Sequence, residues 1–73
     1  MTPIQCKMAR VATGLTVRKL GEITGLAFST INRYEKTGRA NISTVNKMIE
    51  ALEAAGVEFI PENGGGVGVR LRK

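Results

Sequence analysis

The sequence predicts an all-α fold, a bundle of four helices, that ends in a short β-hairpin. Apolar residues recur at helical spacing up to about residue 56. Beyond that point a glycine-rich turn separates two β-prone segments, and the second alternates with period two. Because 73 residues leave room for one small domain, we expect a helical domain over residues 1–56 and a hairpin extension over residues 57–73.

The composition argues against an enzyme and against a metal or other cofactor. The chain has no histidine and no aspartate, so catalytic triads, zinc cages and most calcium loops lack their usual residues. Cys6 is the single cysteine, and one unpaired thiol suits a reducing compartment. With no apolar run of ~18 residues and no apolar signal segment at the N-terminus, we expect a cytoplasmic protein.

The charge is unevenly distributed along the chain. The net charge is +5 and the isoelectric point is near 10.0. Residues 1–47 hold eight basic and two acidic residues, residues 48–69 hold four glutamates and no base, and residues 70–73 hold three basic residues. A basic first two-thirds favours a polyanionic partner.

The first helix is expected to begin at Thr2, where Thr2 and Gln5 form a capping box around Pro3. Gly14 ends it. Two stripes compete for its buried face, and periodicity does not choose between them. One stripe is Ile4, Met8, Val11, Ala12 and Leu15, and the other is Cys6, Ala9 and Thr13.

Two short helices follow, joined by a tight turn. The second is expected from an N-cap at Thr16 to about residue 24, with Gly25 ending it. The third spans about residues 28–36 and ends before Gly38. Their expected inward-facing residues are Val17, Leu20, Gly21, Thr24, Thr30, Ile31 and Tyr34.

The fourth helix is expected to begin at a cap on Asn41 and to end before Gly56, with an apolar stripe of Val45, Met48, Ile49, Leu52 and Ala55. The tail predicts strands at 57–60 and 67–72 around a turn at 61–66. The buried face of this hairpin should carry Val67, Val69 and Leu71. Because an isolated two-stranded hairpin is marginal, it needs the fourth helix beneath it or a second copy beside it.

Two short helices joined by a glycine turn inside a bundle are typical of a helix-turn-helix. Gly21 is small where the third helix must approach the second, and Gly25 lies at the turn. The apolar residues that would lock the two helices together are Leu20, Leu26, Ile31 and Tyr34. In this arrangement the third helix projects polar side chains as a rigid unit into the DNA major groove.

The stretch GLTVRKLGEITGLAFSTINRYEKTG, residues 14–38, resembles the λ-repressor/Cro-like helix-turn-helix family, also called the XRE family. The matching positions are Gly14, Leu15, Thr16, Leu20, Gly25, Leu26, Ile31, Glu35 and Gly38. The resemblance covers residues 1–56, and the tail resembles the C-terminal extension of many small bacterial regulators. Three positions differ: Val17 replaces a phosphate-contacting glutamine, Gly21 an alanine, and Ala27 the serine or threonine that caps the third helix.

The resemblance implies a double-stranded DNA interface on the third helix. The implied base contacts are Phe28, Ser29, Asn32 and Arg33. Arg33 can fork onto guanine, Asn32 can reach adenine, and Phe28 either lies against thymine methyl groups or folds onto the edge of the core. At the start of the second helix and after the third, the phosphate candidates are Thr16, Arg18, Lys19, Lys36, Thr37, Arg39 and Asn41.

The resemblance also implies a structural pair between Arg10 and Glu35. That pair would turn Arg10 inward and select the stripe of the first helix that contains Cys6. Cys6 then becomes a small core residue and not a redox switch.

We therefore expect a DNA-binding transcriptional regulator. A homodimer would read two half-sites of a pseudo-palindromic operator about 34 Å apart, with the hairpin and the fourth helix helping to build the dimer, and autoregulation fits such a protein. The alternative is an antitoxin or antiactivator on the same fold, in which Phe28 marks a protein-contact surface. RNA binding is weaker, because Phe28, Tyr34 and Phe59 do not form a stacking platform.

Overall fold

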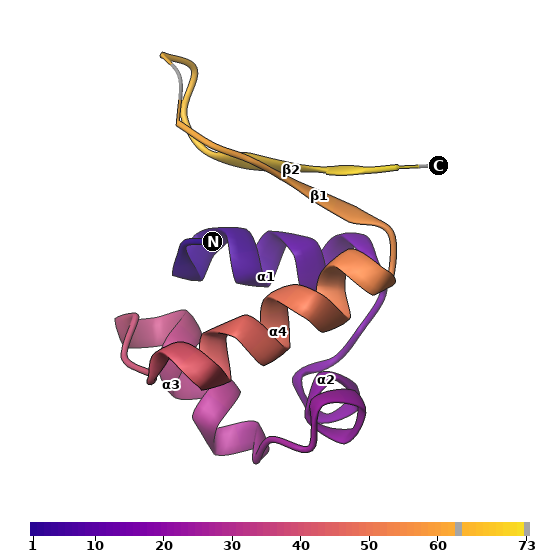
Figure 1. The fold of residues 1–73 in the computed structure, drawn as a ribbon, viewed down its shortest axis with the longest axis vertical. Coiled ribbons are helices and arrows are strands. Elements are labelled where there is room, and N and C mark those ends of the chain that lie inside the picture. Colours follow the sequence, from indigo (N-terminus) through magenta and orange to yellow (C-terminus); the bar gives the residue numbers. More distant parts are fainter. Residues whose placement is uncertain (63, 73) are drawn as a thin grey trace.

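The computed structural model describes residues 1–62 and 64–72 (Figure 1). Asn63 of the predicted turn and Lys73 of the predicted extension lie outside the described residues. The described residues form four helices and one hairpin, which confirms the predicted fold. The elements are α1 (Pro3–Ala12), α2 (Val17–Thr24), α3 (Phe28–Thr37), α4 (Ile42–Ala54), β1 (Val57–Ile60) and β2 (Gly68–Leu71). Within the described part, no helix combines the length and the apolar character that crossing a membrane requires.

Three helices begin at the side-chain caps that the sequence predicts. Thr2, Thr16 and Asn41 each accept a hydrogen bond from the backbone N–H three residues later, and the capping box of α1 is complete. α3 begins after Ala27 without a side-chain cap. At the other end of α4, Ala55 is the exposed C-cap and not part of the buried stripe.

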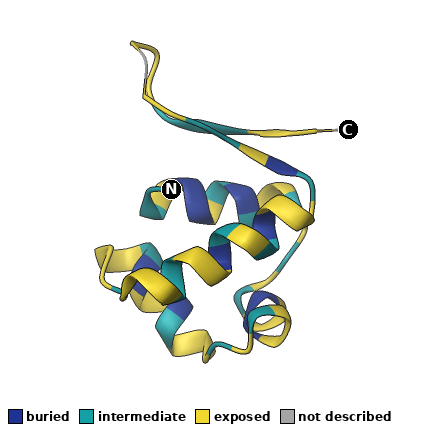
Figure 2. Cartoon of the chain, in the orientation of Figure 1, coloured by how far each residue is buried: buried dark blue, intermediate teal, exposed yellow. Residues whose placement is uncertain are grey.

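Of the two candidate stripes of α1, the one that contains Cys6 is buried in the core. Cys6 and Ala9 are fully buried, whereas Ile4 and Val11 are 54% and 63% exposed. α3 and α4 pack against the buried side of α1, and the buried positions gather where the helices face one another (Figure 2). The other core residues are Leu20, Ile31, Tyr34, Met48, Leu52 and Val57.

The hairpin rests on α1 and α4 together, and not on α4 alone. β2 contacts α1, and β1 contacts α4. The strands are antiparallel, with Val57 opposite Leu71 and Ile60 opposite Gly68. The apolar face of the hairpin therefore closes the open side of the helix bundle.

Two details of the predicted hairpin are wrong. β2 begins at Gly68 and ends at Leu71, so it is shorter than the expected 67–72. Leu71 is 48% exposed, although it was expected to be buried. It lines a shallow hollow beside Ala12 and Gly56, and these small residues do not cover its side chain.

Gln5 ties the hairpin to the first turn of α1. Its side chain is buried, and its oxygen accepts a bond of 2.8 Å from the backbone N–H of Thr2. Its amide nitrogen donates to the carbonyl oxygens of Ile60 and Gly68, both at 2.9 Å. These two carbonyls belong to paired residues at the turn end of the hairpin, so one side chain fixes both strands on α1.

Candidate nucleic-acid interface

Backbone hydrogen bonds around Gly25 hold the turn between α2 and α3. Gly25 has a φ of 75°, a left-handed conformation that costs other residues ~1–2 kcal/mol. The N–H groups of Gly25 and Leu26 both donate to the carbonyl of Gly21, at 2.8 and 3.1 Å. The turn thereby sets the direction in which the chain enters α3.

Gly21 allows this turn to lie against α2. A Cβ atom at Gly21 would lie 2.7 Å from the backbone oxygen of Leu26, closer than side-chain atoms pack. On its inner side α3 is anchored by Ile31 and Tyr34, both buried, and the Tyr34 hydroxyl donates to the carbonyl of Met1 at 3.0 Å. α3 is therefore held as a rigid unit against α2 and the N-terminus.

The outer face of α3 presents the side chains that the sequence singled out. Phe28, Ser29, Asn32 and Arg33 are all exposed, and their spacing places them on one side of the helix. Within residues 1–62 and 64–72, the side chains of Ser29, Asn32 and Arg33 make no hydrogen bond or ion pair. Their donors and acceptors therefore remain available to an external partner.

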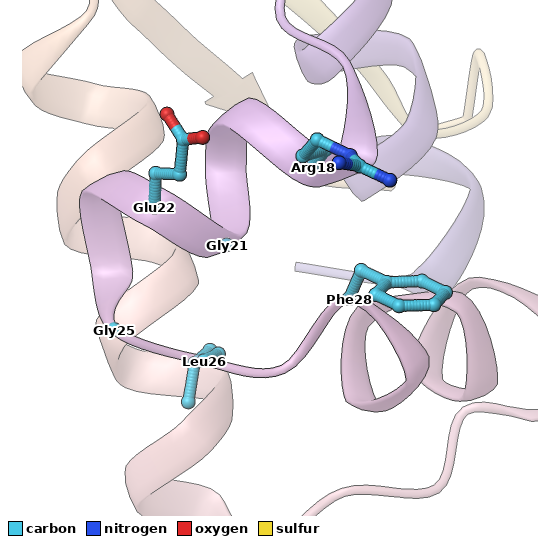
Figure 3. Close-up of a pocket in the computed structure, with 6 residues that line it drawn as sticks. All are labelled: Arg18, Gly21, Glu22, Gly25, Leu26 and Phe28. Carbon is cyan, nitrogen blue, oxygen red and sulfur yellow. The ribbon is translucent and has the colours of Figure 1, made fainter.

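A hollow between α2 and the start of α3 extends this face. Arg18 from α2 and Phe28 from α3 both extend toward the same side of this hollow (Figure 3). Phe28 is 57% exposed, so its ring does not close the edge of the core. The hollow, about 450 Å³, is lined by Arg18, Gly21, Glu22, Gly25, Leu26 and Phe28.

Comparison with known families decides what this geometry represents. The sequence profile of the helix-turn-helix family matches residues 7–59, more than half of the chain. The chain belongs to the helix-turn-helix family. This match confirms the λ-repressor/Cro-like resemblance and makes the protein a DNA-binding regulator in the general sense. Among curated proteins, none matches the chain.

Four of the phosphate candidates of this helix-turn-helix are exposed cations. They are Arg18, Lys19, Lys36 and Arg39. Lys19 lies 3.6 Å from Glu22, and both side chains are more than half exposed. This contact leaves the cation open to solvent, and exposed pairs of this kind contribute little.

The other three phosphate candidates are polar side chains that already bond to backbone groups at helix ends. The Thr16 oxygen accepts from the N–H of Lys19, and the Asn41 oxygen accepts from the N–H of Thr44. Thr37 uses its single proton to donate to the carbonyl of Arg33 at 2.7 Å. In this conformation Thr37 has no proton for a phosphate oxygen, whereas the Asn41 amide nitrogen is still a donor.

Arg10 and Glu35 form a bidentate pair behind the helix-turn-helix. Arg10 Nε and Nη2 lie 2.9 and 3.0 Å from the two Glu35 oxygens, and Nη1 donates to the carbonyl of Leu15 at 3.2 Å. The side chains are 14% and 8% exposed. The hydrogen bonds to Glu35 raise the pKa of Arg10, so its guanidinium stays charged at neutral pH.

Cys6 adjoins this pair, with its sulfur 3.5 Å from a Glu35 oxygen. Burial, and then the negative charge of Glu35, raise the pKa of the Cys6 thiol from 9.0 to about 12. The thiol is therefore protonated and unreactive at neutral pH.

Two side-chain contacts, one on α2 and one at the hairpin, were not predicted from the sequence. The spacing of Lys19 and Glu22, three residues apart on one helix, is a signal that could have predicted their contact. Gln5 was assigned only to the capping box. Its bonds to the hairpin join residues 55 and 63 positions apart, and no local pattern indicates such a contact.

Proposed function

We propose that this protein is a sequence-specific transcriptional regulator that inserts α3 into the major groove of DNA. One observation carries the proposal. Phe28, Ser29, Asn32 and Arg33 share the exposed face of a helix that is anchored on its other side by buried residues. A rigid helix with unpaired polar side chains on one face suits the width of the major groove.

The chemistry of these four side chains supports recognition of base edges. Arg33 can donate two bonds to guanine O6 and N7, and Asn32 can form a bidentate pair with adenine. Ser29 can contact either a base or a phosphate. The exposed ring of Phe28 offers an apolar surface to a thymine methyl group.

The contacts to the DNA phosphate backbone would come from the surrounding cations and from the start of α3. Arg18 and Lys19 lie in the first turn of α2, and Lys36 and Arg39 lie at the end of α3 and just after it. The first N–H groups of α3 have no side-chain cap, and helix N-termini of this kind bind phosphate. Asn41 and Thr16 would contribute at the edges of the same surface.

The protein would act as a homodimer on a pseudo-palindromic operator. A single recognition helix reads few base pairs, and two copies on half-sites about 34 Å apart multiply the specificity. Control of its own gene fits this scheme, so the DNA upstream of that gene is the first probe.

Fluorescence anisotropy tests the proposal. The probes are a duplex from upstream of the protein's own gene and a scrambled duplex of the same composition, across a salt series. We expect the upstream duplex to bind at least a hundredfold more tightly than the scrambled one. We also expect the affinity to fall steeply as the salt concentration rises. Arg33→Ala should weaken binding to the upstream duplex by roughly 10–100-fold, whereas Arg72→Ala, an equal loss of charge on the hairpin, should not.

Equal, weak binding to both duplexes that Arg33→Ala leaves unchanged would contradict the proposal. The exposure of Phe28 would then favour the alternative, a protein-contact surface of the antitoxin or antiactivator type. In that case Phe28→Ala would abolish binding to a partner protein without changing retention on DNA.

A further inference from the structure

β2 has one edge without a partner in the described part of the chain. The N–H of Arg72 donates to the carbonyl of Gly56 at 2.8 Å, so the even-numbered residues of this segment turn their backbone groups toward β1. Val69 and Leu71 therefore direct their N–H and C=O groups away from β1. Such an edge is a template for another strand.

An apolar flank of α1 borders this edge. Ile4, Met8 and Val11 follow one another at helical spacing, and Ile4 and Val11 are more than half exposed. The neighbouring side of α1 carries Gln5, which bonds to Gly68 of β2. Since β1 lies over α4, the apolar flank continues from β2 on the side away from β1.

We propose that this surface, the β2 edge and the Ile4–Met8–Val11 flank of α1, pairs with the same surface of a second copy. The two β2 strands would run antiparallel about a two-fold axis and join the hairpins into one four-stranded sheet. The inference rests on the proposed function only in that an operator with two half-sites requires two copies.

In one register, the backbone groups and the apolar side chains of β2 match those of β2 in the second copy. With Val69 opposite Val69 of the second copy, the outward N–H and C=O groups of the two residues bond to each other. Leu71 then lies opposite the second copy's Val67. Val57 and Phe59 of β1 extend the same face, so every row on the inner side of the sheet is apolar.

The charges on the outer face are compatible with this register. Arg70 lies 3.2 Å from Glu58 of its own hairpin, and across the two-fold axis it would face Gly68 of the second copy. Sliding one strand by two residues, which moves the two-fold axis by one residue, would place Arg70 opposite Arg70, and directly opposed like charges destabilise a sheet. Charge therefore favours the register centred on Val69.

The placement of this surface leaves the DNA-contacting face open. The hairpin and the adjoining side of α1 lie at one end of the molecule, and α2 and α3 lie at the other (Figure 1). A specific interface buries at least ~1,200 Å² in total, or about 600 Å² from each copy, and this half is about an eighth of the 4704 Å² surface of one copy. The pairing therefore requires a small share of the surface of each copy and covers none of the α3 residues.

Cysteine cross-linking of the full chain tests the register without DNA. Val69→Cys and Arg70→Cys are compared in a Cys6→Ala background, under mild oxidation. Directly opposite residues that exchange both backbone bonds have Cα atoms about 5.5 Å apart, within the range that disulfides span. The Val69→Cys chain should therefore form a covalent dimer. The two Cys side chains of the Arg70→Cys chain would lie on a diagonal ~7–8 Å apart and should cross-link at least tenfold more slowly.

Sedimentation equilibrium tests the association itself. The native chain should be dimeric at tens of micromolar, and Leu71→Pro should be monomeric, because proline removes an outward N–H that the hairpin does not use. Leu71→Val keeps that N–H and should remain dimeric, and circular dichroism checks that each variant is folded. A folded, monomeric native chain at these concentrations would overturn the proposal, as would faster cross-linking of the Arg70→Cys chain. Either failure leaves the Arg33 test of DNA binding unaffected.

Discussion

Arg10 and Glu35 show how a charged pair fixes the helix-turn-helix from behind. The pair is bidentate, nearly buried and backed by a third bond to the carbonyl of Leu15. It joins α1 to α3, and so it sets the position of α3 relative to the rest of the bundle. A buried pair adds little net stability, but removing one partner leaves the other charge without compensation.

Glu35→Ala should therefore lower the free energy of unfolding by about 3 kcal/mol, the lower end of the range for broken buried pairs. Arg10→Met combined with Glu35→Leu should cost less than Glu35→Ala alone, because no charge is left buried. Urea denaturation followed by circular dichroism measures both variants. A loss well below ~1 kcal/mol for Glu35→Ala would show that the pair behaves as an exposed one.

Cys6 gives the fold a dependence on alkaline pH. The folded-state pKa of its thiol, about 12, lies above the unfolded value of 9.0. The resulting stability is fully present below pH 9 and is lost as the pH rises toward 12. The native chain should therefore lose more stability between pH 8 and pH 11 than Cys6→Ala does.

Urea denaturation at several pH values checks this difference. The raised pKa of Tyr34, which also comes from burial, affects both chains in the same direction and largely cancels in the comparison. Equal losses in the two chains would mean that the thiol is solvated in the folded protein.

At the scale of the elements, the hairpin depends on α1 through Gln5. The Gln5 amide nitrogen bonds to the carbonyls of Ile60 and Gly68, while its oxygen completes the capping box. The hairpin has two strands of four residues each, and such a hairpin is marginal without packing against a helix. Gln5 is therefore the polar link that keeps the sheet on the bundle.

Gln5→Glu separates the two roles of this side chain. A glutamate at this position still accepts from the N–H of Thr2, but a carboxylate cannot donate to the two carbonyls. Amide hydrogen exchange should accelerate at least tenfold in β1 and β2 and much less in α2 and α3, which serve as the internal reference. Uniform acceleration in all elements would show that Gln5 supports the whole fold and not the hairpin in particular.

At the scale of the whole molecule, the sequence predicts the helices better than their packing. Caps and glycines at Thr2, Thr16, Gly25 and Asn41 mark the helix ends within a residue or two, because these signals are local. The choice between the two stripes of α1 required knowing where α3 and α4 lie, as did the exposure of Leu71. Both depend on tertiary neighbours that periodicity does not specify.

The interface shows the same division between local pattern and tertiary contact. The four residues on the outer face of α3 follow from helical spacing and from the family resemblance. That Thr37 uses its proton within the helix is visible only in three dimensions, whereas the spacing of Lys19 and Glu22 already favours their contact. The hairpin lies at the far end of the molecule from α2 and α3 (Figure 1), so the proposed DNA-contacting face and the proposed dimer surface are separate.

An NMR titration of the ¹⁵N-labelled protein with the duplex from upstream of its own gene shows directly whether α3 contacts DNA. We expect amide shifts to concentrate at Phe28, Ser29, Asn32 and Arg33 and at the first turn of α2, with little change in β1 and β2 at constant protein concentration. Shifts that gather on the hairpin and the outer flank of α1 while α3 stays unchanged would contradict DNA recognition by α3.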